Sequence, residues 1–242
     1  MSRRARRHEG RTLSGSSAAH PAPVRSFVIR TGHLTVAQQR ALSELLPRYA
    51  LPRERPLEAF TRQAPRVLEI GIGNGENLVA MAAREPGHDF LGSEVHRPGL
   101  GHALLGIEKR GLGNLRLHDS DALDLLTTLP PASLAAVHIY FPDPWPKKRH
   151  HKRRLMKAGL PDRLARVLRR GGRLYFATDD AHYAAAALAL LDDTPGWFNL
   201  AGRGRYALRP QHRIVTRFEQ RARRAGSAIY DLAFASLGTP AS

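Results

Sequence analysis

From Arg66 onward, apolar and polar positions follow two different periods along the chain. Short apolar runs, typical of strands buried on both faces, cover residues 67–70, 89–95, 115–118, 134–141 and 173–178. Between them, apolar residues recur three or four positions apart. This spacing predicts helices over 75–84 and 97–110, and a further helix that ends at Arg170.

Helical and extended patterns also occur on both sides of this region. Residues 35–46 predict a short helix with Thr35 as its N-cap, and a connector punctuated by prolines follows over 51–65. An Ala- and Leu-rich segment predicts a helix over 181–191. Two more strands, 197–200 and 228–234, are expected to form a hairpin-like pair near the end of the chain.

Strands that alternate with helices at this spacing predict βαβ units. We therefore expect an α/β protein with a Rossmann-like, doubly wound and mostly parallel sheet, covered by helices on both faces. Residues 25–242 are expected to form one domain. Residues 1–24 are rich in Arg, Ser, Ala and Pro and lack apolar periodicity, so we expect a disordered basic arm. A transit peptide is the less favoured alternative for this arm.

Composition excludes several classes of site. The chain contains no cysteine, which excludes disulfides, thiolate zinc sites and cysteine nucleophiles and fits a cytoplasmic protein. Its twelve histidines show no metal-ligand spacing on one predicted helix, so we expect no metal. No apolar run approaches the roughly 18–20 residues of a membrane span, so we expect no membrane contact.

The formal net charge of +17 favours a polyanionic partner, and nucleic acid is the obvious candidate. A generally arginine-rich proteome is the alternative explanation. The positions of the charges along the chain have to separate the two.

Carboxylates follow each predicted strand of the alternating region. Because parallel strands place their carboxyl ends at one edge of the sheet, these acids are expected to gather around one crevice. Asp121 and Asp180, taken singly, have helix capping as an alternative role. The acids are Glu69, Glu94, Asp119, Asp121, Asp143, Asp179 and Asp180.

The first turn carries glycines at every second position: Gly71, Gly73 and Gly75. Glycine permits positive φ and close approach of the backbone to a ligand. A dinucleotide-binding turn needs a small residue where this chain has Glu76, and Glu69 would face a pyrophosphate. An acidic turn suits a cationic sulfonium and its amino-acid moiety better.

Glu94 ends the second strand, 25 positions after Glu69, and is placed to accept from both ribose hydroxyls. These residues favour S-adenosylmethionine over NAD as the cofactor. An NAD-dependent oxidoreductase stays as a distant alternative.

The fourth strand ends in the segment Phe141–Trp145, in which two prolines flank Asp143. A fixed carboxylate beside an aromatic ring resembles a slot for a planar base; a rigid surface loop is the alternative. A basic run follows at residues 147–154. Next to a catalytic mouth it favours a contact with the phosphate backbone over a solvated charged face.

Together these residues resemble the bacterial tRNA (guanine-N7)-methyltransferase family, over about residues 25–237. The family's enzymes methylate the variable-loop guanosine, position 46, of tRNA, and the resemblance implies a sheet of the class I methyltransferase type. The most specific pair of motifs is Phe141–Trp145 with its basic tail and Thr216–Arg221. The other matching segments are 25–28, 67–71, 90–96, 114–116 and 177–179.

The resemblance implies a role for each matching position. Cofactor binding falls to Glu69, Glu94, Asp121 and Asp143, beside the glycines Gly71, Gly73 and Gly75, and Asp143 is also the implied catalytic residue. The family more often has Lys where Arg217 stands, which alters the donor geometry. The implied substrate contacts are Lys147, Asp179, Thr216, Arg217, Phe218 and Glu219, and the implied RNA contacts are Arg149, His150, His151, Lys152, Arg153 and Arg154.

Guanine N7 carries a lone pair and no proton, so its methylation needs no general base. Alignment and a negative environment help instead, and Asp143 can supply both. The sequence leaves two alternatives open. A methyltransferase of the same type could act on rRNA, an adenine or a protein, and a non-catalytic RNA-binding module could keep the same fold. The carboxylates of the crevice argue against a pure RNA binder.

Overall fold

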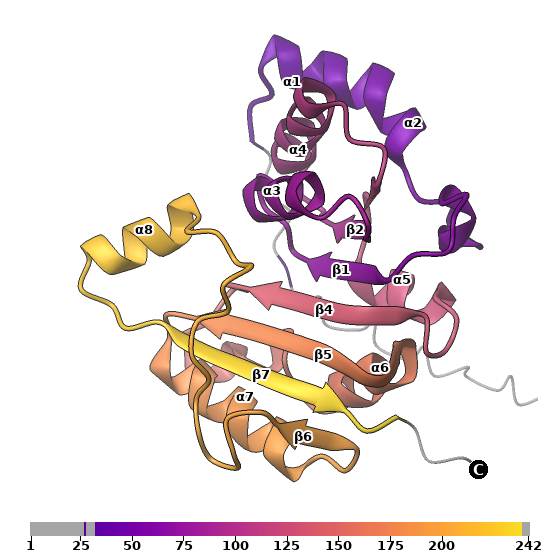
Figure 1. Cartoon of the computed structure of the whole chain (residues 1–242). Coiled ribbons are helices and arrows are strands. Elements are labelled where there is room, and N and C mark those ends of the chain that lie inside the picture. The colour runs from indigo at the N-terminus through magenta and orange to yellow at the C-terminus, as the bar shows by residue number, and fades with distance from the viewer. Residues whose placement is uncertain (1–26, 28–31, 239–242) are drawn as a thin grey trace, which may run out of the picture.

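The computed structural model describes Phe27 and residues 32–238. These residues form a seven-stranded sheet of order β3-β2-β1-β4-β5-β7-β6 (Figure 1). Strands β1 to β5 are parallel, whereas β7 runs antiparallel to both β5 and β6. The doubly wound, mostly parallel sheet is confirmed. The strands are β1 (Arg66–Ile70), β2 (Asp89–Ser93), β3 (Leu115–His118), β4 (Leu134–Tyr140), β5 (Leu168–Thr178), β6 (Trp197–Asn199) and β7 (Tyr230–Ser236). The expected basic arm, residues 1–24, lies outside the described residues.

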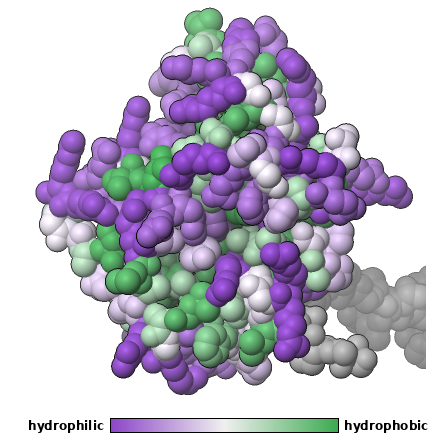
Figure 2. All heavy atoms as spheres, in the orientation of Figure 1, coloured by the Kyte–Doolittle hydropathy of each residue, from purple (hydrophilic) through white to green (hydrophobic). Residues whose placement is uncertain are grey.

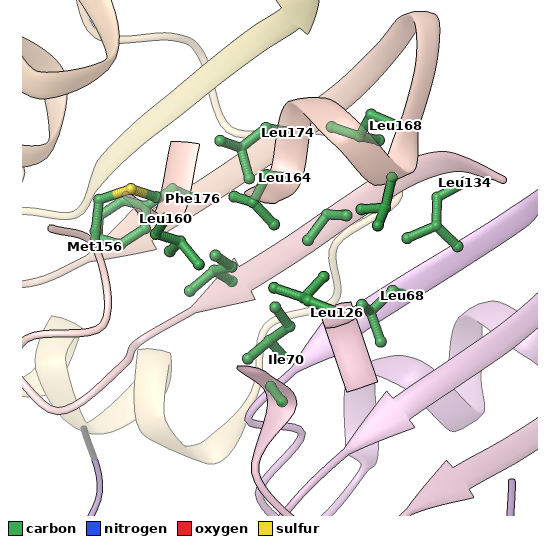
Figure 3. Packing of buried hydrophobic residues seen from close by; sticks show 14 of the residues in the cluster. Leu68, Ile70, Leu126, Leu134, Met156, Leu160, Leu164, Leu168, Leu174 and Phe176 are labelled. Atoms are coloured by element: carbon green, nitrogen blue, oxygen red, sulfur yellow. The ribbon is translucent and has the colours of Figure 1, made fainter. Parts of the chain in front are cut away.

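One apolar cluster fills each face of the sheet. The cluster on the first face packs α5 (Ala122–Thr128), α6 (Leu160–Val167) and α7 (Ala181–Asp193) against β1, β4 and β5. Figure 3 shows Leu68 and Ile70 of β1 beside Leu126 of α5, in the same cluster as Leu160 and Leu164 of α6.

The cluster on the second face joins β1, β2 and β3 to two groups of helices. Alternate strand residues serve the two clusters: Val67 packs on this face, and Leu68 on the other. The helices here are α3 (Glu76–Arg84), α4 (Arg97–Arg110) and the N-terminal group α1 (Val36–Arg40), π-helical η1 (Ala41–Leu45) and α2 (Leu46–Tyr49). No helix in the described part of the chain is long and apolar enough to cross a membrane.

Several predicted boundaries are confirmed. Thr35 caps α1 through a capping box with Gln38, and α4 and β3 occupy the predicted residues. The second strand, predicted over residues 89–95, ends two residues earlier, at Ser93. Short helices went unpredicted at α5, at two 3-10 segments, η2 (Pro56–Ala59) and η3 (Lys148–Arg153), and at α8 (Arg217–Arg224).

The helix predicted to end at Arg170 is wrong in its last residues. Helix α6 ends at Val167, and β5 begins at Leu168, which pairs with Leu134. The next pair joins Ala136 to Arg173, so residues 169–172 bulge out of the ladder. Local spacing cannot show where the backbone leaves a helix to pair with a distant strand.

The last two strands pair antiparallel, as expected, but they are not a hairpin. Residues 200–229, including α8, lie between them. Figure 1 shows the first part of this connection running across β7, β5 and β4, over a stretch of the sheet that no helix covers on that side. Ala207 pairs with Asp231, and the Tyr140 hydroxyl lies 3.2 Å from Nε2 of His212.

A buried guanidinium fastens this connection to the sheet. Arg213 is 1% exposed; its Nη1 donates to Glu219 at 2.6 Å and its Nη2 to both Asp231 oxygens at 2.9 Å. Its guanidinium carbon also lies 5.3 Å from the ring centre of Tyr140 and 5.5 Å from that of Phe141. One side chain therefore links α8, β7 and the end of β4.

We predict that Arg213→Met lowers the free energy of unfolding by about 3–5 kcal/mol, because it leaves the Asp231 carboxylate buried without its ion-pair partner. Denaturant unfolding measures this loss. Arg209→Met is the matched control: Arg209 is partly exposed, and Glu219 keeps two other guanidiniums there, so we expect a loss of about 1 kcal/mol or less. Equal losses in the two variants would contradict the structural role of Arg213.

Candidate active site

A cavity of about 370 Å³ opens at the carboxyl ends of β1, β2 and β4. The parallel strands bring the acids that follow them to one edge, as the sequence predicted. Nine of the predicted site residues line the cavity: Glu69, Gly71, Gly73, Glu94, Asp121, Asp143, Thr216, Arg217 and Phe218. Ten others do not: Gly75, Lys147, Asp179, Glu219 and the six expected RNA contacts, Arg149, His150, His151, Lys152, Arg153 and Arg154.

The glycine turn after β1 forms the floor of this cavity. Gly71, Gly73 and Gly75 all have positive φ, of 74°, 55° and 73°. A Cβ at Gly71 would meet no atom within 4 Å, so the missing side chain leaves room for a ligand. Gly75 has a different reason: a Cβ there would lie 2.6 Å from the Cβ of Ala103, so this glycine lets α3 pack closely on α4.

Glu94 leaves β2 and turns back over the glycine turn. Its carboxylate accepts hydrogen bonds from the backbone N–H groups of Gly73 at 2.8 Å, Val95 at 2.8 Å and His96 at 2.9 Å. These bonds hold a negative charge at a fixed place on the cavity wall. Among the described residues, Oε2 accepts only the bond from Gly73, so it keeps a lone pair that a hydroxyl donor of a ligand can use.

Glu69 is the innermost acid of the cavity. Its side chain is 4% exposed, and its Oε2 accepts a 2.6 Å hydrogen bond from Nδ2 of Asn77. Burial raises the pKa of this carboxyl to about 7, and the Asn77 bond opposes the rise. Asn77, which the sequence did not single out, also accepts from the backbone N–H of Ile214 at 3.0 Å and so joins Glu69 to the connection before α8.

Asp121 and Asp180, for which helix capping was the alternative role, both cap helices. Asp121 caps α5 by accepting from the N–H of Leu123 at 2.9 Å, and it lines the cavity as well. Asp180 caps α7 by accepting from the N–H of Tyr183 at 2.6 Å. Asp179, beside it, is exposed.

The segment Phe141–Trp145 projects Asp143 at the cavity. Both of its ends are in the left-handed region, with φ of 52° at Phe141 and 46° at Trp145. Such conformations are rare outside glycine and asparagine and persist only where the surroundings hold them. The strained loop supports the prediction of a rigid carboxylate, and Asp143 itself is exposed to the cavity.

The side chain of Arg154 helps to hold the loop 141–145 in this conformation. It was expected to contact RNA, but it is 4% exposed. Its Nε donates to the carbonyl of Pro144 at 2.8 Å, and its guanidinium lies over the ring of Tyr183 at 4.6 Å and 3.7 Å from Asp180. This arginine ties the loop to α7 and offers no free charge to a ligand.

The rest of the basic run is available at the surface. Residues 148–153 form η3, and Lys147, Arg149, Lys152 and Arg153 are exposed. Arg153 lies 4.9 Å over the Trp145 ring, and His150 and His151 are half-buried. Among the described residues, no cluster of acids and histidines is arranged to hold a metal ion.

The opposite wall comes from the residues around the start of α8. Thr216 caps this helix. The carboxylate of Glu76 in α3 accepts from the backbone N–H of Arg217 at 3.3 Å and pairs with the Nε of Arg217 at 3.1 Å. Phe218 is 61% exposed and lies against Gly73. Glu219 is fully buried between the guanidiniums of Arg209, Arg213 and Arg223, so it anchors the helix and does not face the cavity.

The cavity suits a ligand with a cationic end and several hydroxyl donors. Five carboxylates line it, those of Glu69, Glu76, Glu94, Asp121 and Asp143, and two of its glycines leave space where side chains would stand. A pyrophosphate would meet Glu69 and Glu94 at close range, which disfavours NAD. Tyr140, the last residue of β4, and Arg213 also line the cavity and were not predicted; Arg213 reaches it only because residues 200–216 fold onto the sheet.

Comparison with known proteins agrees with this chemistry. A family model described as "Putative methyltransferase" matches residues 63–232. The chain is 47% identical to the tRNA (guanine-N(7)-)-methyltransferase of Alcanivorax borkumensis over 216 residues, which cover 87% of this chain and 90% of that protein. Proteins of the same name from Alkalilimnicola ehrlichii and Thiobacillus denitrificans are 48% and 46% identical and cover 87% and 92% of this chain and 91% and 99% of their own lengths.

Two solved structures share the fold. The aminoglycoside resistance methyltransferase NpmB1 has a TM-score of 0.52 at 16% identity, and the antibiotic-resistance methyltransferase Kmr has 0.51 at 19%. Each similarity covers 78% of this chain and 95% of the other. At such identities they show a common methyltransferase fold.

We predict that Glu94→Ala weakens the binding of S-adenosylhomocysteine about ten- to a hundredfold, because hydrogen bonds to a charged acceptor contribute about 1.5–3 kcal/mol. Calorimetric titration measures the affinity, and thermal unfolding checks the fold. Asp119→Ala is the control, since Asp119 follows β3 but lies outside the cavity lining and pairs with Arg53. Equal affinities in the Glu94 variant and the parent would remove Glu94 from the cofactor site.

We further predict that the affinity for S-adenosylhomocysteine, whose amino group is cationic, rises with pH between about pH 5.5 and 8. The buried carboxyl of Glu69, with its pKa of about 7, must ionise to attract that group. The sign is opposite for folding: because the folded pKa is raised from 4.5 to about 7, the unliganded protein loses stability as the pH rises from about 4.5 to about 7. Glu69→Gln is expected to remove both dependences, and their persistence in that variant would rule out Glu69 as their source.

Proposed function

The chain belongs to the tRNA (guanine-N(7)-)-methyltransferase family and is an S-adenosylmethionine-dependent methyltransferase that acts on guanine N7 of tRNA; on this premise we propose that its target is the variable-loop guanosine, position 46. The observation that carries the proposal is one shared cavity. The acids and glycines of the cofactor turn form its floor, and Asp143 and residues 216–218 form its walls. A methyl donor and a base therefore meet in the same space.

The cavity's own residues divide the work of holding the cofactor. Glu69 faces its cationic amino-acid end, and Glu94 accepts from the ribose hydroxyls. Asp121 and Asp143 complete the acidic wall. S-adenosylmethionine supplies an electrophilic methyl group on a sulfonium. The open space beside Gly71 and Gly73 fits a ligand close to the backbone.

Asp143 positions the guanine and stabilises the charge that develops on it. As the N7 lone pair forms a bond to the methyl carbon, the carbon–sulfur bond breaks, its electron pair stays on sulfur, and the positive charge passes to the base. A carboxylate at a fixed place favours that transfer of charge. It also accepts from the amino edge of guanine, and an adenine would leave this acceptor unpaired. No proton has to be removed.

The substrate lies along the basic surface near the cavity. We assign the RNA backbone to the exposed members of the run, Arg149, Lys152 and Arg153, with His150 and His151 between them, and Lys147 and Asp179 to the edge of the site. Thr216, Arg217 and Phe218 contact the nucleotide from the other wall. Arg154 and Glu219 act indirectly, because both are buried and hold the two walls in place.

We also propose that the enzyme works in the cytoplasm, as one methyltransferase domain from residue 25 to 242. The absence of cysteine and the bacterial tRNA methyltransferases among its relatives support this location.

One assay tests the function. The protein is incubated with unmodified tRNA and labelled S-adenosylmethionine, and the product nucleoside is identified by mass spectrometry. We expect 7-methylguanosine, and none from a transcript in which only guanosine 46 is replaced by adenosine. Methylation of that transcript at the same rate would exclude position 46, and a product other than 7-methylguanosine would exclude the reaction itself.

We predict that Asp143→Asn lowers single-turnover methylation about 10²–10³-fold, with smaller effects on tRNA and cofactor affinity. The amide keeps the shape but loses the negative charge that faces the cationic product base. Rates at saturating substrates across about pH 6 to 9 test the mechanism. A general base would instead give the parent an acidic limb that vanishes in the variant, and near-parental turnover in the variant would return the loop to a structural role.

A further inference from the structure

We propose that α8 is a second element that binds the tRNA backbone, with Arg221 and Arg224 contacting phosphates across the cavity from those contacted by residues 147–153. The inference rests on the proposed function, since it assigns a further surface to the same substrate. It differs from the contacts around Thr216–Glu219, which concern the target nucleotide.

The helix carries its arginines on the side opposite its anchor. Arg217, Arg221 and Arg224 are four and three residues apart and therefore share one face. Glu219 and Ala222 are its buried residues, and about 100° per residue places them on the opposite face. At the cavity end of this face Arg217 meets Glu76, and further along it Arg221 and Arg224 are exposed to solvent.

Two of the three charges of this stripe, those of Arg221 and Arg224, are not used within the described part of the protein. Arg217 is paired with Glu76, and Arg223, outside the stripe, is paired with Glu219. Within the described residues, Arg221 and Arg224 have no acidic partner and no side-chain hydrogen bond. Like charges three residues apart destabilise an isolated helix. An external polyanion relieves that repulsion.

The position of the stripe is set by buried groups. Glu219 ties α8 to the preceding connection through the guanidiniums of Arg209 and Arg213, and the Thr216 hydroxyl caps its first turn. Figure 1 shows α8 standing out from the sheet, beyond the arrowheads of β1 and β4, where the cavity lies. Hydrophilic side chains extend from that side of the molecule in Figure 2.

The cavity mouth lies between two basic elements. Residues 147–153 continue from the wall that carries Asp143, and α8 continues from the wall that carries Thr216 to Phe218. About 1.5 Å per residue puts Arg224 roughly 10 Å beyond Arg217 along the helix axis. A nucleotide in the cavity is thus flanked by cations on both sides, and its two neighbouring backbone segments can each meet one of them.

The test compares the salt dependence of tRNA binding among three charge-neutralised variants. The first is Arg221→Gln with Arg224→Gln, and the second is Lys148→Gln with Lys152→Gln on the other wall. The control is Arg169→Gln with Arg170→Gln; these residues are exposed at the start of β5, at the opposite end of the sheet from the cavity. Fluorescence anisotropy with labelled tRNA, in saturating S-adenosylhomocysteine, gives Kd between about 50 and 200 mM salt.

We expect the α8 variant to lower the logarithmic salt slope by about 0.7–0.9 for each lost phosphate contact and to bind tRNA several-fold more weakly, whereas the control keeps the parent slope. The affinity for S-adenosylhomocysteine stays at the parent value, which shows that the variant is folded. A fourth, combined variant carries all four substitutions of the first two. If the two basic elements contact different phosphates, its loss of binding free energy is the sum of the losses in those two variants.

A parental slope in the α8 variant would reduce α8 to a solvated face. A combined variant that loses no more than either pair alone would overturn the assignment to two separate backbone segments. Both results are distinct from failure of the proposed function, which would show as a parent protein that binds tRNA but forms no 7-methylguanosine.

Discussion

The buried guanidinium of Arg213 holds together the parts of the chain that make the site. It is bonded to one carboxylate from α8 and one from β7, and it packs against the rings of Tyr140 and Phe141. A guanidinium buried away from water is stable only when carboxylates and hydrogen-bond acceptors surround it. The positions of Glu219 and Asp231 around Arg213 therefore fix the path of the connection. Thr216 to Phe218 reach the cavity because Arg213 anchors the chain just before them.

The same fold places negative charge inside a strongly positive molecule. The net charge is +17, yet five carboxylates line one cavity. Four of them lie there because parallel strands end together and the end of each carries or precedes an acid. The two fields serve different partners: the basic surface attracts the RNA, and the acidic cavity holds a cationic cofactor and stabilises a cationic base. Asn77 joins the acidic cavity to the connection that leads into α8, since it donates to Glu69 and accepts from the backbone N–H of Ile214.

Much of this could be predicted from local pattern. The boundaries of α4 and β3, the Thr35 cap and the glycine turn are confirmed, because each depends on residues within a few positions of one another. What local pattern did not predict is the burial of charged side chains, which depends on the groups that folding packs against them. Arg154 belongs to a basic run, but Pro144 and Tyr183 bury it; Glu219 belongs to a substrate motif, but three arginines enclose it.

The sequence by itself determined the order of the strands and of the longer helices, the acidic crevice, the cofactor class and the family, because periodicity, turn glycines and short motifs are local properties. Only the tertiary structure decided which charges remain free. A guanidinium or carboxylate is exposed or buried according to the groups that folding brings against it from elsewhere in the chain. Neighbouring charged residues such as Arg153 and Arg154 therefore have opposite roles, for a reason that no short stretch of sequence contains.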